Sequence, residues 1–217
     1  KYNTYNRRSK DYDFDYWSFL PSFAFNPDDG FLLGGSAQFI HYGYKKHPYA
    51  GKHFLSAKYA FATGGVELIY NSELTDAIGD FEVRMDGIYR SPLYSVNFYG
   101  IGNETLNRED SLGIDYHRVR QREIRFSPAL KKMVNTATSF SIGPTFESIR
   151  VERTAGRFID DYAKGEDGPF DEDFFEGQDF LGLRFTFDFS NLDDSNYPAL
   201  GLNFFVDAGW RFRVDNF

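Results

Sequence analysis

Residues 181–214, LGLRFTFDFS-NLDDSNYPA-LGLNFFVDAGWRFRV, contain two segments of two-residue alternation separated by a short polar stretch. Apolar side chains occupy the odd positions of the first segment and the even positions of the second, and Phe205 is the single exception. Since successive side chains of a strand point to opposite faces, this pattern predicts a β-hairpin with one apolar wall and one charged wall. Each strand has the ~9–11 residues that a tilted strand needs to cross a bilayer.

The composition limits the classes of protein that this chain can belong to. It has 217 residues, enough for one large β domain, and no Cys, which excludes disulfide bonds and thiol chemistry. The net charge of -8 disfavours nucleic acid as a partner. The apolar runs are too short for a transmembrane helix, but a spanning strand needs apolar residues only at every second position.

Further alternating segments, separated by turn signals rich in Gly, Pro, Asn and Asp, precede the hairpin. They cover residues 17–25, 31–44, 53–62, 66–74, 80–89, 116–129 and 136–151. Two long connections, 91–115 and the acidic 153–179, then fall at the same end of an up-and-down sheet. Short turns at one end and long loops at the other are typical of outer-membrane barrels. We expect residues 1–16 to be a linker and residues 17–217 to form part of a barrel domain.

The apolar wall carries large aromatic side chains in almost every strand, and further aromatic residues gather near strand ends, as at a membrane interface. The opposite wall carries charges of both signs, which can pair across a wet lumen. A membrane barrel is therefore favoured, and a soluble lipocalin-like barrel, apolar within, stays open as an alternative. The predicted lumen charges are Glu82, Arg84, Asp86, Arg184, Asp207 and Arg211.

Three motifs, in this order, resemble the Omp85 (bacterial surface antigen) superfamily. They are FLPSFAFNPDDGFLLGG at 19–35, similar to the first barrel hairpin, NFYGIGNET at 97–105, and the hairpin turn that follows residue 188. The resemblance extends to assembly-factor barrels and to barrels attached to metallophosphatase-like or patatin-like enzymes. The residues that carry it, and are candidates for structural or functional roles, are Pro21, Gly30, Gly100, Gly102, Asn103, Asp188, Tyr197, Pro198 and Gly201.

The resemblance implies an all-β, antiparallel, up-and-down transmembrane β-barrel in the bacterial outer membrane. About nine or ten strands of a sixteen-stranded barrel would be present. The implied function is polypeptide insertion or translocation, or anchoring or export of a fused enzyme domain, with no enzymatic activity and no cofactor in the barrel itself. The implied partners are outer-membrane lipid, polypeptide substrates and accessory assembly proteins. In that family the lateral seam involves the first strand, where Pro21 removes one backbone donor.

Other readings remain open. A passive outer-membrane pore or structural barrel would show the same strand pattern, as would the soluble ligand-binding barrel. The acidic loop, residues 160–176, has carboxylates for a divalent cation but lacks the EF-hand spacing, so a solvated loop is favoured. His117 beside Asp115 could form the acid–histidine part of a protease site, and is more simply a structural histidine.

Overall fold

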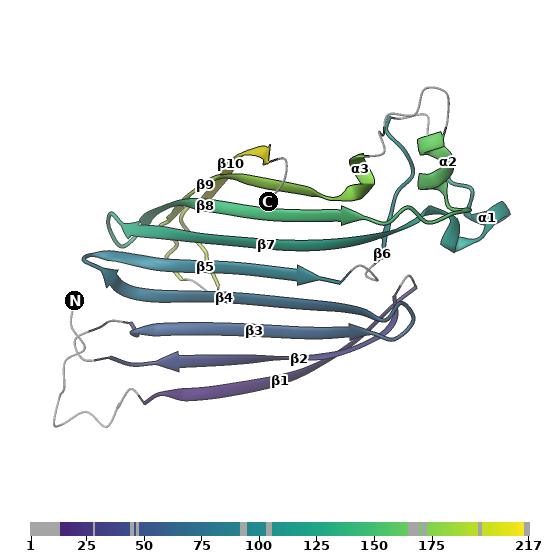
Figure 1. The fold of residues 1–217 in the computed structure, drawn as a ribbon. Helices are drawn as coiled ribbons and strands as arrows, with labels where there is room; N and C mark the ends of the chain where they lie inside the picture. The colour runs from purple at the N-terminus through teal and green to yellow at the C-terminus, as the bar shows by residue number, and fades with distance from the viewer. Residues whose placement is uncertain are drawn as a thin grey trace.

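The computed structural model describes residues 14–27, 29–43, 46, 48–91, 95–102, 106–164, 170, 173–194 and 197–214. Over these residues the chain forms a ten-stranded antiparallel sheet, which Figure 1 shows as a curved wall of adjacent strands. The strand order is β1-β2-β3-β4-β5-β7-β8-β9-β10, and the short strand β6 pairs with β7. The predicted all-β, antiparallel, up-and-down arrangement is therefore confirmed.

The strands have the following bounds: β1 Tyr16–Asn26, β2 Gly30–His41, β3 Gly51–Ala60, β4 Gly65–Ile78, β5 Phe81–Arg90, β6 Ser95–Asn97, β7 Arg118–Met133, β8 Thr138–Val151, β9 Gln178–Ser190 and β10 Asn203–Val214. Within the described residues β1 pairs only with β2 and β10 only with β9, so the sheet is not closed. Closure into a barrel and the total of sixteen strands therefore stay predictions.

The boundaries differ from the predicted ones at a few places. Strand β1 begins one residue before the predicted domain boundary. Strand β4 runs through the predicted turn at 76–79 to Ile78. Asp76 adopts a φ of 49° there, and the pairing with β5 shifts between Leu74 and Ile78. This is a β-bulge, which lets a strand continue past a turn-like residue. The chain then reverses at Gly79, where φ is 61°.

The connection between β5 and β7 and the connection between β8 and β9 lie at the same end of the sheet, as predicted from the strand count. They are not simple loops, because they contain the short helices α1 (Glu109–Leu112), η1 (Ile114–His117), α2 (Phe158–Lys164) and α3 (Asp173–Glu176). Figure 1 shows these helices gathered beyond the ends of β7 and β8. Within the described part of the chain, no helix is long and apolar enough to cross a membrane.

Helices α2 and α3 and the nearby ends of β7 and β8 form a small apolar cluster, which we call the loop core. Its buried members are Val119, Val151 and Ile159. Partly buried aromatic residues pack around it, including Phe98 and Phe174. The sequence shows no regular period here because the helices are one or two turns long, and their packing depends on aromatic contacts between two distant loops.

The sheet is curved, and its charged and apolar faces lie on opposite sides of the curve. Arg184 of β9 lies 3.5 Å from Asp86 of β5, although β7 and β8 separate these strands. Arg211 of β10 similarly binds Glu147 of β8 across β9. Side chains can meet over intervening strands only on the inside of a curve, so the charged face is concave and the apolar face is convex.

Candidate functional site

A row of alternating charges crosses the concave face. Lys58 of β3 donates to Glu67 of β4 at 3.1 Å, and Glu67 also accepts from Arg90 Nε of β5 at 2.9 Å. Arg90 in turn binds Glu123 of β7. These contacts follow from register, because Lys58 lies directly opposite Glu67, Glu67 opposite Arg90, and Arg90 opposite Glu123. Opposite charges on directly facing residues of neighbouring strands stabilise the sheet.

The same row continues to the last strand. Arg125 of β7 lies 3.8 Å from Glu123 and 3.9 Å from Glu147 of β8, and Arg211 of β10 donates to Glu147. The glutamate side chains are nearly buried, with 11% of Glu123 and 8% of Glu147 exposed, whereas the arginines remain partly open to the concave side. We call this row the charge ladder, and its members are Lys58, Glu67, Arg90, Glu123, Arg125, Glu147 and Arg211.

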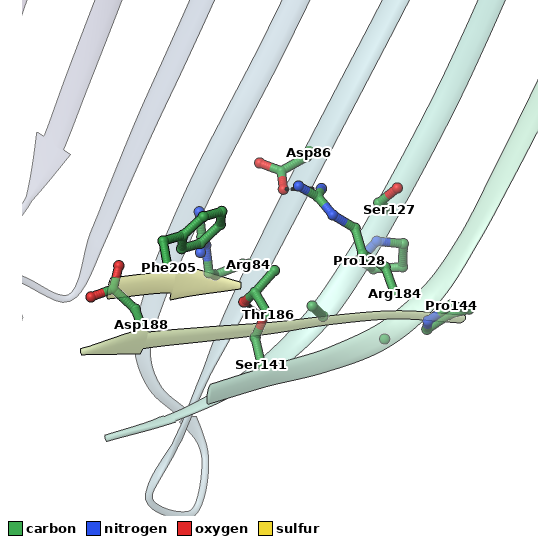
Figure 2. Close-up of a pocket in the computed structure, with 12 residues that line it drawn as sticks. Arg84, Asp86, Ser127, Pro128, Ser141, Pro144, Arg184, Thr186, Asp188 and Phe205 are labelled. Atoms are coloured by element: carbon green, nitrogen blue, oxygen red, sulfur yellow. Dashed lines mark hydrogen bonds and ion pairs between the residues drawn. The ribbon is translucent and has the colours of Figure 1, made fainter. Parts of the chain in front are cut away.

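A second charged cluster centres on Arg184 of β9. Its Nε donates to Asp207 Oδ1 at 3.0 Å and its Nη2 donates to Asp207 Oδ2 at 2.6 Å, while its Nη1 lies 3.5 Å from Asp86. Figure 2 shows the Arg184 side chain extending past Pro128 toward Asp86. Such a two-pronged arginine–carboxylate pair has a defined geometry as well as a favourable charge interaction. The cluster thus ties β9 to both β10 and β5.

A cavity of about 180 Å³ lies beside this cluster. Its lining includes hydroxyl and charged side chains from four strands, among them Arg84, Asp86, Ser127, Ser141, Thr186 and Asp188. Phe205, the exception in the alternation of the last hairpin, lines the same cavity and lies on the concave side (Figure 2). A polar cavity of this size accommodates several water molecules, each of which takes about 30 Å³ in the liquid.

The strand pairing beneath this cavity is interrupted. The register of β7 and β8 runs to Phe126 and resumes at Leu130, without backbone pairs between them. Pro128 of β7 and Pro144 of β8 lie in this gap, and proline has no N–H to donate to the ladder. Gly143 lies in the same gap. Only glycine fits there without a shift of the backbone, because a Cβ at this position would lie 1.9 Å from the carbonyl oxygen of Pro128. The two backbones therefore approach more closely here than side chains would allow.

Hydroxyl groups bridge the concave side of the same region. Ser127 Oγ and Thr145 Oγ1 lie 2.7 Å apart across the interrupted β7–β8 pairing. Ser141 Oγ and Thr186 Oγ1 lie 2.5 Å apart between β8 and β9. Both pairs are buried, so these hydrogen bonds satisfy polar atoms that have lost contact with solvent.

The convex face has the opposite character. Its large apolar side chains are exposed to an extent unusual for a soluble protein, with 76% of Phe23, 54% of Leu183 and 67% of Trp210 accessible. Similar residues occur along the same face of the intervening strands, including Leu55, Leu68, Phe126 and Ile142. The result is a continuous apolar surface over the convex side, which an apolar medium or another apolar surface would cover.

The predicted lumen charges all lie on the concave face, and each of the six has an oppositely charged partner. Glu82 binds Lys131 at 2.8 Å, and Arg84 lies 3.5 Å from Glu73. Glu73 also accepts a hydrogen bond from Tyr49 at 2.7 Å. The remaining predicted charges belong to the ladder or to the Arg184 cluster: Asp86, Arg184, Asp207 and Arg211. The structure therefore brings the charged residues together as the alternation predicted.

The candidate residues of the family motifs do not form one site. Pro21 lies on the edge strand β1 opposite Gly35 of β2. Gly30, Gly100 and Gly102 lie at the end of the sheet that carries the helices, with φ values of 71°, 103° and 111°. Asn103 lies outside the described residues. Asp188 lies on the concave face of β9 and lines the cavity beside Arg184.

The remaining motif residues lie in the β9–β10 turn, at the opposite end of the sheet. Tyr197 is 86% exposed. Gly201 has a φ of 124°, and a Cβ there would lie 2.7 Å from the carbonyl oxygen of Asn191, so this position needs glycine. The turn is held by Asp193, whose Oδ1 accepts from the backbone N–H groups of three residues: Asp194, Ala199 and Leu200. These hydrogen bonds lower the pKa of the Asp193 carboxyl, with the Leu200 N–H as the largest cause.

The two alternative chemical sites gain no support. His117 is fully buried, and its Nδ1–H donates to the Phe98 carbonyl at 3.2 Å while its Nε2 accepts from the Arg108 N–H at 3.1 Å. Asp115 binds Arg118 instead of the imidazole. His117 is therefore a structural residue, whose hydrogen bonds hold the backbone at Phe98 and Arg108.

In the acidic loop, Asp160 accepts from Lys164 Nζ at 2.6 Å and from Arg153 Nε at 2.8 Å. The Lys164 ammonium and then the Arg153 guanidinium hold the pKa of this carboxyl below its ordinary value. Over the residues that the structure describes, no three His, Asp or Glu side chains gather in a way that could hold a metal ion. Glu166, Asp167, Asp171 and Glu172 lie outside those residues.

Much of the charge ladder was not predicted from the sequence. Arg90, Glu123, Arg125 and Glu147 were not among the predicted lumen charges, although they form its centre. The alternation around residues 116–129 is noisy, which hid the orientation of Glu123 and Arg125. The pattern that could have revealed them is that Glu123 and Arg125 alternate with Ile124 and Phe126, which lie on the apolar face.

Comparison of this chain with models of known protein families, with curated proteins and with solved structures found no match.

Proposed function

We propose that this chain forms part of the wall of an outer-membrane β-barrel. Its convex apolar face contacts lipid, and its concave charged face lines an aqueous lumen. Following the Omp85 resemblance, the barrel inserts or translocates polypeptide, or anchors or exports a fused enzyme domain. The observation that carries the proposal is the curvature of the sheet, with exposed aromatics on the convex side and ion pairs on the concave side.

The direction of curvature weighs against the soluble alternative. A lipocalin-like barrel encloses its apolar side chains and exposes its charges to water. Here the charged side chains of β5, β8, β9 and β10 meet on the inside of the curve, as shown by the Arg184–Asp86 and Arg211–Glu147 contacts. The long strands, such as β1 with 11 residues and β9 with 13, also have the length needed to cross a bilayer at a tilt.

Two neighbouring phenylalanines provide a matched test. Phe204 is 52% exposed on the convex face, and Phe205 is 56% exposed on the concave face. Because the chain has no Cys, Phe204→Cys and Phe205→Cys each introduce one site for a nitroxide spin label. The full chain is reconstituted in phosphatidylethanolamine–phosphatidylglycerol liposomes, and collisions of the label with oxygen and with a water-soluble nickel chelate are compared.

We expect the label at position 204 to be relaxed mainly by oxygen, which concentrates in the bilayer, and the label at 205 mainly by the nickel chelate. Equal access of the nickel chelate to both labels, or the reverse pattern, would contradict the lipid-facing arrangement. Failure of the chain to float with the liposomes in a density gradient would contradict it as well.

The activity needs a separate assay. Proteoliposomes that speed the folding of a second, urea-unfolded β-barrel polypeptide, relative to empty liposomes, would support insertion. A steady ionic conductance without that effect would support the second candidate function, a passive pore, which the polar cavities of the concave face favour. The absence of both effects in membrane-inserted protein would leave anchoring as the supported role.

A further inference from the structure

We propose that Arg125, Arg184 and Arg211 form a binding site for an oxyanion, either a carboxylate or a phosphate group. The three arginines line one open cavity of about 480 Å³ on the concave face, together with Ser127, Asp207 and Gly209. They come from β7, β9 and β10, which the curvature of the sheet brings together. The proposal needs only this concave geometry and does not depend on the convex face contacting lipid.

Arg125 is the least satisfied member of the charge ladder. Its two carboxylate neighbours lie 3.8 Å and 3.9 Å away, beyond hydrogen-bond distance. Glu123 and Glu147 instead accept hydrogen bonds from Arg90 and Arg211. Within the described residues Arg125 therefore has no hydrogen-bond acceptor for its guanidinium, although its side chain is only 33% exposed. A guanidinium has five N–H donors, and its planar fork fits carboxylate and phosphate oxygens.

Arg211 has unused donors as well. Over the described part of the chain, the hydrogen bonding of its guanidinium is limited to the one from Nη1 to Glu147. Arg184, in contrast, is committed to Asp207 through Nε and Nη2. An incoming oxyanion would therefore be held mainly by Arg125 and Arg211, with Arg184 adding positive charge.

The charge around the cavity also favours an anion. The side chains that line it are three arginines and one aspartate, whereas the carboxylates of Glu123, Glu147 and Asp86, which pair with these arginines, lie outside the lining. A concave, partly desolvated surface concentrates the potential of the charges that line it and raises the local concentration of the opposite charge. Ser127 lies in the same lining and adds a hydroxyl that can donate to an oxyanion.

The test is a titration of the full chain in detergent micelles, with ¹⁵N-labelled arginine. Inorganic phosphate and, separately, acetate are added at constant ionic strength, and the Nε–Hε cross peak of Arg211 is followed by NMR. We expect a saturable shift. Saturation by phosphate alone assigns a phosphate group, saturation by acetate alone assigns a carboxylate, and saturation by both assigns a general oxyanion site.

The variant Arg125→Gln should weaken binding about tenfold, because a charge-assisted hydrogen-bond partner is lost. Lys58→Gln is the matched control, since it removes one positive charge from the far end of the same ladder, and it should change affinity less than about twofold. A shift that grows linearly with both anions without saturating, or an equal loss of affinity in both variants, would overturn the proposal.

A second variant at the same position tests the proposal even if Arg125→Gln fails to fold. Arg125→Lys keeps the positive charge and removes the planar fork, so it should bind several-fold more weakly than the unchanged chain. If Arg125→Lys binds phosphate and acetate as tightly as the unchanged chain does, Arg125 does not contribute a fork to the site, and the proposal fails.

Discussion

Replacing Glu147 with Gln should destabilise the sheet measurably, because this carboxylate joins three strands. It lies on β8, binds Arg211 of β10, and lies 3.9 Å from Arg125 of β7. Gln keeps the size of the side chain and removes the charge. Loss of one partner from a fully buried ion pair costs about 3–5 kcal/mol, and loss of an exposed pair costs about 0.2–1 kcal/mol. Glu147 is 8% exposed but its arginine partners are 33% and 40% exposed, so the case is intermediate.

We therefore expect Glu147→Gln to lower the free energy of unfolding by about 1.5–3 kcal/mol. The measurement is a urea titration of the full chain in detergent micelles, followed by tryptophan fluorescence, to which Trp210 on β10 contributes. Glu152→Gln is the control, because Glu152 is 39% exposed and lies 3.9 Å from Arg120; its effect should stay below about 0.5 kcal/mol.

A double-mutant cycle of Glu147→Gln with Arg211→Gln isolates the contact between these two residues. We expect a coupling free energy of about 1 kcal/mol or more, since a hydrogen bond to a charged group contributes in that range. Equal effects of Glu147→Gln and Glu152→Gln, or a coupling free energy of zero, would refute the reasoning that the ladder stabilises the concave face.

Three further perturbations test other parts of the structure. Gly143→Ala should lower the free energy of unfolding in the same urea titration by about 2 kcal/mol, which is within the usual range for overpacking, because the added Cβ would lie 1.9 Å from a carbonyl oxygen. Gly209→Ala is the control. Its Cβ would have no heavy atom closer than 3.7 Å, so it should change the free energy of unfolding by less than about 0.5 kcal/mol. Asp193→Ala removes the acceptor of three backbone N–H groups, so protease cleavage of the β9–β10 turn should become faster in folded protein, and an unchanged cleavage rate would contradict that role. Because the pKa of Asp160 is lowered, its charged form stabilises the loop core above the ordinary carboxyl pKa of about 3.9, and this contribution is lost as the pH falls below that value. The amide hydrogen-exchange protection of Ile159 should therefore drop in acid. In Asp160→Asn the protection of Ile159 should be low at neutral pH and should not depend on pH.

The sequence predicted the long strands well wherever one face was purely apolar. The hairpin 181–214 is the clearest case, because its alternation leaves one orientation in which all the large apolar residues share a face. Phe205, the exception in that pattern, lies on the concave face as its position requires. The same alternation correctly placed the predicted lumen charges on one wall.

The pairing of particular charges could not be predicted in the same way. Which charge faces which depends on register, and register depends on turn geometry and on irregularities such as the bulge at Asp76. The contacts between Arg184 and Asp86 and between Arg211 and Glu147 depend further on curvature, which no period in the sequence expresses. The short helices of the loop core arise from aromatic packing between two connections, and local propensity does not determine such contacts.

The order of strands in this sheet has a consequence for how it forms. Each long strand pairs with the next long strand in sequence, so the topology has a low contact order for an all-β protein. The sheet can grow hairpin by hairpin, and each added strand offers its free edge to the one that follows. The slowest additions should be the pairings of β5 with β7 and of β8 with β9, which close the long connections 91–117 and 152–177 and carry a larger loop-closure entropy than the tight turns. Shortening either connection should therefore speed folding more than shortening any of the tight turns.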